Sequence, residues 1–182
     1  MTALPPFPAR DRPVAGTPAY LRDRGFRLRA ACSDDLPALA ALYADTRAAE
    51  MAGVPWPRVA KQGFLDQQFQ LQHRHYVTHY ADANFMVVER EGRLCGRYYL
   101  QRTPPEHLVV DISLLAACRG QGLGAALILA TQEEAAALGC GVGLHVVRNN
   151  TGAWRLYERL GFEACAGGSD THQRMCWRPA LS

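Results

Sequence analysis

Hydrophobic and polar positions follow two different periods along this chain, and each change of period marks an expected element. Residues 26–31 alternate apolar side chains with arginine, which is typical of a half-buried strand. Ser33, Asp34 and Asp35 then favour the start of a helix, because short polar side chains cap a helix N-terminus and acidic residues stabilise its first turn. We expect this first helix to end near Glu50.

A second helix, of about twenty residues, is expected after the proline-containing break at residues 51–57. Its apolar residues at helical spacing are Phe64, Leu65, Phe69 and Tyr76. Two strand-like segments follow at 84–89 and 94–100, on either side of a Glu-Gly turn. They predict an antiparallel hairpin.

The C-terminal half alternates strands with helices. Residues 108–115 are almost continuously apolar, as expected for a strand that is buried on both faces at the centre of a sheet. A glycine-rich turn and a helix through Leu138 follow, and then a strand at 142–147. A last helix over about 150–160 precedes two short strands, at 162–166 and 174–177.

These elements predict an α/β (α+β) fold with a mixed, mostly antiparallel sheet of six or seven strands and helices on both faces. Residues 1–24 are rich in proline and lack apolar periodicity, so we expect an extended or disordered leader there. Residues 25–182 are expected to form one domain, because 182 residues lie within the usual range for a single domain.

Composition and charge narrow the choice of partners. No stretch approaches the roughly 18 apolar residues of a membrane span, and Pro5, Pro6 and Pro8 stand where a secretory signal would be apolar. We therefore expect a cytoplasmic protein with no membrane partner. The net charge is only +3 and the basic residues form no dense run, so no nucleic-acid partner is expected.

The cysteines and the lysine exclude two further classes of site. The 6 cysteines are scattered singly, without a C-x-x-C pair, and we expect them to be reduced and to bind no metal. Of the 20 basic residues only Lys61 is lysine, and Gln62 follows it. A Walker A loop requires Ser or Thr after its lysine, so a P-loop kinase or NTPase is excluded.

The most informative segment is Arg119-Gly-Gln-Gly-Leu-Gly124, between the buried strand and a helix. Glycines allow consecutive backbone N–H groups at a helix N-terminus to approach a phosphate, and the helix dipole favours the negative charge. The segment therefore indicates a pyrophosphate site, but it does not say which ligand carries the pyrophosphate.

A dinucleotide is one alternative ligand. Gly120-x-Gly122-x-x-Ala125 fits the permissive Rossmann pattern, and Arg148 could then bind the 2′-phosphate of NADP. A Rossmann domain needs further strand-helix units, however, and too little of the chain remains after this point to supply them.

A second motif favours coenzyme A. Arg119-x-x-Gly122-x-Gly124 resembles the R/Q-x-x-G-x-G/A signature of the GNAT (GCN5-related N-acetyltransferase) family, and Asn150-x-x-Ala153-x-x-Leu156-Tyr157-x-x-x-Gly161-Phe162 is similar to its later N-x-x-A-x-x-L-Y-x-x-x-G-F segment. The resemblance covers roughly residues 27–177, in outline only before Tyr80. It implies that the strands at 108–115 and 142–147 run parallel and splay apart at the coenzyme.

The same resemblance implies the coenzyme-binding residues, with acetyl-CoA as co-substrate and no metal. The backbone near Leu114 and Ala116 would pair with the pantetheine arm, and the amides of residues 121–125 would hold the pyrophosphate. Many relatives have proline at the position of Ala116, which leaves the turn geometry open. The implied set is Leu114, Ala116, Arg119, Gly120, Gln121, Gly122, Leu123, Gly124, Ala125, Asn150 and Tyr157. Asn150 also fits a plain helix N-cap.

Two residues are candidates for the chemistry of acyl transfer, in which the amine must be neutral and the departing thiolate needs a proton. Tyr157 matches the family tyrosine that is thought to be the general acid, although an aromatic residue that only packs the helix on the sheet would look the same. Asp111 is polar within an apolar strand, which is costly without a partner or a function. In many relatives an acidic residue eight positions before the arginine faces the acceptor, and Asp111 has that spacing. The resemblance therefore implies that Asp111 binds or deprotonates the amine, unless it is a structural carboxylate or part of a salt bridge. On strand alternation Asp111 shares a face with Val109 and Ser113. Lesser candidates for the base are Glu106, His107 and His145.

The predicted function is transfer of acetyl from acetyl-CoA to a primary amine of a small molecule or peptide, by direct attack in a ternary complex. The resemblance places the acceptor beside the first two helices, and a homodimer is a further possible partner. The polar and aromatic residues there, which also fit a solvated helix face, are Glu50, Met51, Trp56, Gln68, Gln72, His75 and Tyr76. Two alternatives stay open: an inactive module that senses acyl-CoA, and an NADP-dependent oxidoreductase.

Overall fold

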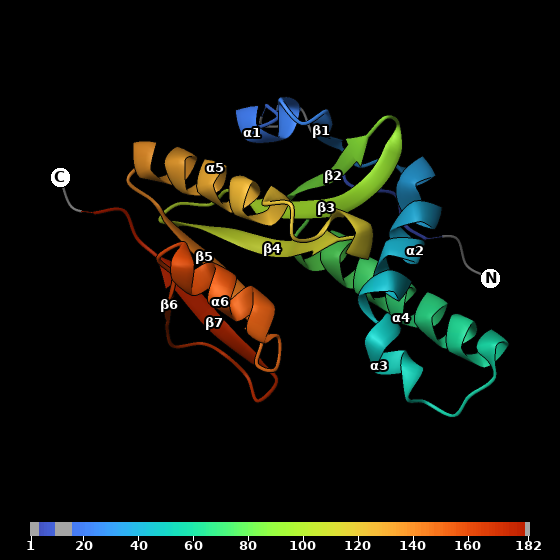
Figure 1. The fold of residues 1–182 in the computed structure, drawn as a ribbon. Coiled ribbons are helices and arrows are strands. Elements are labelled where there is room, and N and C mark those ends of the chain that lie inside the picture. Colours follow the sequence, from blue (N-terminus) through green and yellow to red (C-terminus); the bar gives the residue numbers. More distant parts are fainter. Residues whose placement is uncertain (1–3, 10–15, 181–182) are drawn as a thin grey trace.

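The alternating segments pair into one sheet in the computed structural model, which describes residues 4–9 and 16–180 (Figure 1). The sheet has seven strands in the order β1-β2-β3-β4-β5-β7-β6, and β4 with β5 is its one parallel pair. The strands are β1 (Phe26–Ala30), β2 (Asn84–Arg90), β3 (Arg93–Gln101), β4 (Glu106–Leu114), β5 (Gly141–Val147), β6 (Glu163–Ala164) and β7 (His172–Trp177). The prediction of a mixed, mostly antiparallel sheet is confirmed.

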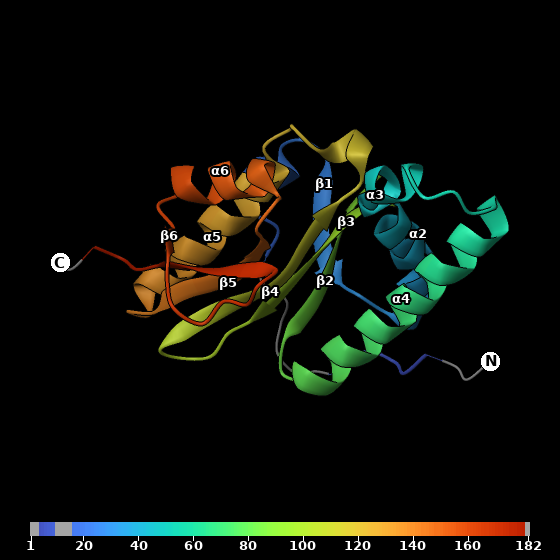
Figure 2. The ribbon, with the colours of Figure 1, turned by 90° about the horizontal axis from the view of Figure 1, so that it is seen from below.

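Helices cover both faces of this sheet, as predicted (Figures 1 and 2). One face carries α2 (Leu36–Thr46), α3 (Ala48–Ala52) and α4 (Arg58–His79), and the other carries α1 (Ala19–Arg22), α5 (Leu123–Ala137) and α6 (Thr151–Arg159). Two single 3₁₀ turns, η1 (Ser33–Asp35) and η2 (Ala116–Cys118), precede α2 and α5. The first predicted helix is thus divided at Arg47, between α2 and α3.

The parallel pair opens partway along its length. Four consecutive residues of each strand are paired, from Glu106 opposite Gly141 to Val109 opposite Leu144. Beyond that point β4 continues to Leu114 without a partner in β5, and the two strands diverge (Figure 2). The implied splay of this pair is confirmed.

A β-bulge in β4 lies where the splay begins. Tyr99 of β3 is opposite Asp111, but Leu100 is opposite Val109, so Val110 is an extra residue on β4. A bulge bends its strand and increases the local twist, which turns the end of β4 away from β5.

The bulge also corrects the predicted faces of β4. Val109 packs in the core on the α5 side together with Ile112, whereas Val110 packs with Tyr99 on the α4 side, where Asp111 also lies. The predicted shared face of Asp111 and Val109 was therefore wrong, because an extra residue resets the side-chain period of two.

Described parts of the N-terminal segment differ from the expected leader. The ring of Phe7 lies against His73, Phe85 and Tyr99, with its centroid 4.9 Å from that of His73. Leu21, in α1, is fully buried. Residues 1–3 and 10–15 of the predicted leader lie outside the described residues. Apolar side chains within a proline-rich segment thus contribute to the core on both faces of the sheet.

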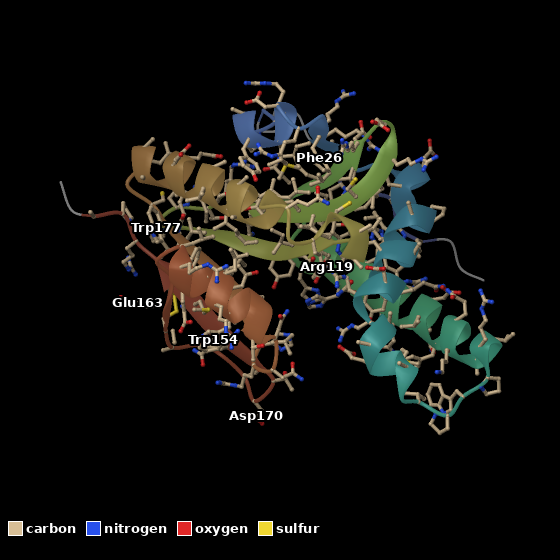
Figure 3. All side chains as sticks on the ribbon, in the orientation of Figure 1. Phe26, Arg119, Trp154, Glu163, Asp170 and Trp177 are labelled. Carbon is tan, nitrogen blue, oxygen red and sulfur yellow. A yellow bond between two sulfur atoms is a disulfide. The ribbon has the colours of Figure 1, made fainter. Side chains whose placement is uncertain are left out.

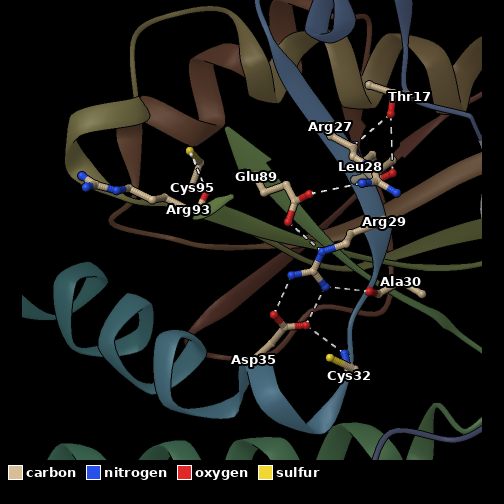
Figure 4. A network of polar contacts seen from close by, with 10 residues as sticks. All are labelled: Thr17, Arg27, Leu28, Arg29, Ala30, Cys32, Asp35, Glu89, Arg93 and Cys95. Atoms are coloured by element: carbon tan, nitrogen blue, oxygen red, sulfur yellow. Dashed lines mark hydrogen bonds and ion pairs between the residues drawn. The ribbon is translucent and has the colours of Figure 1, made fainter. Parts of the chain in front are cut away.

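Ion pairs fasten the outer strand β1 to its neighbours. Arg29 donates to Glu89 of β2 and, through both terminal nitrogens, to Asp35 at the start of α2 (Figure 4). The guanidinium of Arg29 lowers the pKa of Asp35. This pairing fixes the point at which the chain leaves the sheet for α2.

The expectation that all cysteines are reduced is wrong for two of them. Cys165 and Cys176 form a disulfide, with Cα atoms 6.1 Å apart, because β6 and β7 are antiparallel neighbours. Across the described residues, no helix has the length and apolar character that crossing a membrane would require.

Candidate active site

The glycine segment forms the turn between η2 and α5. Gly120 and Gly122 have φ values of 72° and 76°, in the left-handed region that favours glycine. Gly122 is the N-cap residue of α5, and no side chain among the described residues caps this helix end. The first N–H groups of α5 have no partner within the helix, so they are available to an anion.

The unpaired end of β4 leads directly to this turn. The Leu115 N–H donates to the Cys95 carbonyl of β3, so the backbones of Leu115 and Ser113 face β3. The backbones of Ile112 and Leu114 consequently face the gap that β5 has left. Sequence reasoning identified Leu114 but missed Ile112, because the register beyond the bulge cannot be read from the hydrophobic pattern.

Ala116 does not lie on this edge. Its N–H donates to the Asp45 carboxylate of α2 at 2.9 Å, and the residue begins η2 instead of extending β4. The amide that was expected to pair with pantetheine is therefore already bound within the protein.

Arg119 closes the turn. Its Nε donates to the Leu114 carbonyl at 2.8 Å, and its Nη2 lies 3.1 Å from the carboxylate of Asp45. Figure 3 shows Arg119 beside α2, at the end of α5 where the glycine turn lies. The sequence suggested a charge at the rim of the phosphate site, but in the structure Arg119 links β4 to α2 and shares its charge with Asp45.

Tyr157 lies on α6 and is buried against the core, with 6% of its surface exposed. No residue among those described hydrogen-bonds to its hydroxyl. Burial raises the pKa of Tyr157 to about 12, and the charge of Asp111 acts in the same direction. The phenol therefore keeps its proton at neutral pH and has an unused hydrogen bond to donate.

Asp111 lies in a dense polar network on the α4 side of β4. Arg97, only 3% exposed, donates to both carboxylate oxygens, at 3.2 and 2.8 Å. The hydroxyls of Tyr76 and Ser113 each donate at 2.7 Å, and Gln72 accepts a further hydrogen bond from Arg97. Of the two interpretations that the sequence left open, these contacts favour the salt-bridged structural carboxylate over a free base.

The other candidate site residues do not lie together in one cluster. Asn150 accepts a hydrogen bond from the Ala153 N–H at 3.1 Å, so it is the N-cap of α6. Glu106 is ion-paired with Arg174. His107 is buried, and burial lowers its pKa, whereas His145 is exposed on β5.

A mixed sheet whose parallel pair opens beside a glycine turn and an uncapped helix N-terminus is the architecture of a coenzyme A dependent acyltransferase. Residues 46–162 match the acetyltransferase (GNAT) family, and the chain belongs to that family.

Solved structures share the fold at low sequence identity. The PaiA N-acetyltransferase of Thermoplasma acidophilum, in complex with coenzyme A, has a TM-score of 0.65 at 15% identity, over 85% of this chain and 99% of its own. YncA, a putative acetyltransferase of Salmonella typhimurium with acetyl-CoA, has a TM-score of 0.55 at 18% identity, over 86% and 97%. The ribosomal-protein-S18-alanine N-acetyltransferase of Escherichia coli also has a TM-score of 0.55, at 19% identity, over 86% and 96%. No curated protein sequence matches the chain.

Proposed function

We propose that this protein transfers acetyl from acetyl-CoA to a primary amine of a small molecule or peptide, by direct attack in a ternary complex. The observation that carries the proposal is the open backbone edge of β4, which runs into the uncapped N-terminus of α5. One continuous track thus offers strand-like hydrogen bonds and then an anion site, which suits a pantetheine arm that ends in a pyrophosphate.

In this proposal the backbone of Ile112 and the N–H of Leu114 hold the pantetheine arm, and the N–H groups of residues 121–125 hold the pyrophosphate. Arg119 acts by bracing the turn, because its contacts are with Leu114 and Asp45. The coenzymes bound in the PaiA and YncA structures support acetyl-CoA as the co-substrate.

The chemistry requires one proton for the leaving group. The neutral amine attacks the thioester carbonyl, a C–N bond forms, the C–S bond breaks, and the sulfur takes a proton from Tyr157. The nitrogen loses one proton to the solvent, and the Tyr157 phenolate takes one proton back from the solvent before the next turnover. Tyr157 suits this role because its hydroxyl has no other described partner and stays protonated at neutral pH. Asp111 is proposed to have a different role. It holds Arg97 and Tyr76 in place and does not act as a free base.

Acyl transfer is tested by release of free thiol. The protein is first screened by thermal shift with acetyl-, succinyl- and longer acyl-CoA, and thiol release is then followed with a panel of amines. We expect stabilisation by acetyl-CoA and amine-dependent thiol release. Saturable binding without thiol release from any amine would favour the sensing module instead, and tighter binding of NADP than of CoA would favour the oxidoreductase.

Replacing Tyr157 with phenylalanine is expected to lower kcat about 100-fold, because the thiolate then departs without a positioned acid. The Michaelis constant for acetyl-CoA should change little, since the ring and its packing remain. Steady-state kinetics with circular dichroism measure both. Nearly full turnover in a folded Tyr157→Phe variant would contradict the acid role.

The raised pKa of Tyr157 also sets the expected pH dependence. The acid form persists up to a pH of about 12, so kcat should rise with pH while the amine loses its proton and should not fall again by a pH of about 10. A pH profile of kcat at saturating acetyl-CoA measures this. A descending limb near pH 8 or 9, with the fold intact, would show that another group donates the proton.

A further inference from the structure

The short helix α1 is fixed on the coenzyme side of the sheet. Leu21 is fully buried in the core that includes Leu123 and Leu127 of α5. Just before α1, Thr17 Oγ1 accepts a hydrogen bond from the Leu28 N–H of β1 at 3.0 Å (Figure 4). These contacts hold α1 next to the N-terminal half of α5.

From this position Tyr20 reaches the glycine turn. Its hydroxyl donates to the Gln121 carbonyl at 3.0 Å, across a large separation in sequence. The guanidinium of Arg24 lies 3.6 Å from the centroid of the Tyr20 ring and donates to the Tyr20 carbonyl at 3.3 Å. Stacking of this kind holds a ring that would otherwise turn freely on the surface.

The hydrogen bond from Tyr20 fixes the orientation of one peptide group. In a planar trans peptide the C=O and the following N–H point in opposite directions. Because the Gln121 carbonyl points to Tyr20, the Gly122 N–H points away from Tyr20. Glycine populates positive and negative φ about equally, so the peptide before Gly122 could otherwise reverse and present a carbonyl oxygen where the N–H now lies.

We propose that Tyr20 is a positioning residue for the pyrophosphate of the coenzyme, an inference that rests on the proposed function. By holding the Gln121 carbonyl, Tyr20 keeps the Gly122 N–H aligned for the anion and prevents a carbonyl dipole from opposing it. The predicted leader thereby contributes to the site through a residue that neither family motif contains.

The test compares coenzyme A with acetylpantetheine, which lacks the pyrophosphate together with the adenosine 3′-phosphate attached to it. Coenzyme A is titrated by calorimetry, and acetylpantetheine is titrated by NMR. The variant Tyr20→Phe removes one hydroxyl and keeps the ring under Arg24. We expect about fivefold weaker binding of coenzyme A, the effect of one hydrogen bond, and unchanged binding of acetylpantetheine. The matched control is Tyr80→Phe, which also removes one tyrosine hydroxyl but lies at the C-terminal end of α4. This variant should bind both ligands as the unmodified protein does.

The outcomes separate this inference from the proposed function. If the unmodified protein binds no coenzyme A, the proposed function fails and the inference fails with it. If it binds coenzyme A and folded Tyr20→Phe binds equally tightly, only the role of Tyr20 is overturned. Equal losses for both ligands would show a purely structural role and would also overturn the inference.

Discussion

Substitution of Gly122 by valine is expected to weaken coenzyme A binding by about 100-fold or more. Gly122 has a φ of 76°, which a β-branched residue adopts only under strain. A Cβ atom here would also lie 2.6 Å from the Tyr20 hydroxyl, so the side chain would displace Tyr20 or move the turn. Either change removes the alignment of the first N–H groups of α5.

Calorimetry with coenzyme A measures this loss, and circular dichroism checks the fold. The matched control is Gly139→Val, because Gly139 has a similar φ of 66° at the other end of α5 and has open space where a Cβ would lie. That control carries the same backbone strain away from the turn and should bind normally once folded. Unchanged affinity in folded Gly122→Val would remove the phosphate site from this turn.

Arg119 offers a milder comparison at the same turn. A charge at the rim would act through long-range attraction, and the effect of Arg119→Ala would then shrink as salt is raised. A brace between Leu114 and Asp45 would instead act through the geometry of the turn, and its loss would persist at high salt. Because Arg119 contacts Leu114 and Asp45, we expect Arg119→Ala to weaken coenzyme A binding roughly tenfold. Most of this loss should remain at high salt, as measured by titrations at two salt concentrations.

The parts of the site that follow local sequence rules could be predicted. The uncapped start of α5 follows from glycines behind an apolar strand, and Asn150 caps α6 because asparagine is a preferred residue at a helix N-cap. In each case the residues that determine the structure are close together in the chain.

The parts of the fold and site that depend on contacts between distant residues could not be predicted from the sequence. The extra residue Val110 leaves no mark in an apolar strand, since apolar side chains suit either face of a strand whose two faces are both covered by helices. The burial of Leu21 and the partner of Tyr20 depend on where α5 lies in space. The interpretation of Asp111 depends on its ion pair with Arg97. In the sequence, nothing distinguishes Arg97 from the other arginines as the partner of Asp111.

Replacing Asp111 with alanine is expected to lower the free energy of unfolding by about 3–5 kcal/mol, because the charge of Arg97 would remain buried without its counterion. The hydroxyls of Tyr76 and Ser113 would lose their acceptor as well. A carboxylate that served only as a base would give the opposite pattern, with activity lost and stability kept.

Urea unfolding of three variants distinguishes these two roles of Asp111. Asp111→Ala should shift the midpoint strongly, whereas the control Asp170→Ala, at an exposed loop that Figure 3 labels, should leave it unchanged. The double variant Arg97→Met with Asp111→Leu should recover part of the loss, because removing both charges leaves no buried ion without a partner. An unchanged midpoint for Asp111→Ala, together with lost turnover, would return Asp111 to the role of general base.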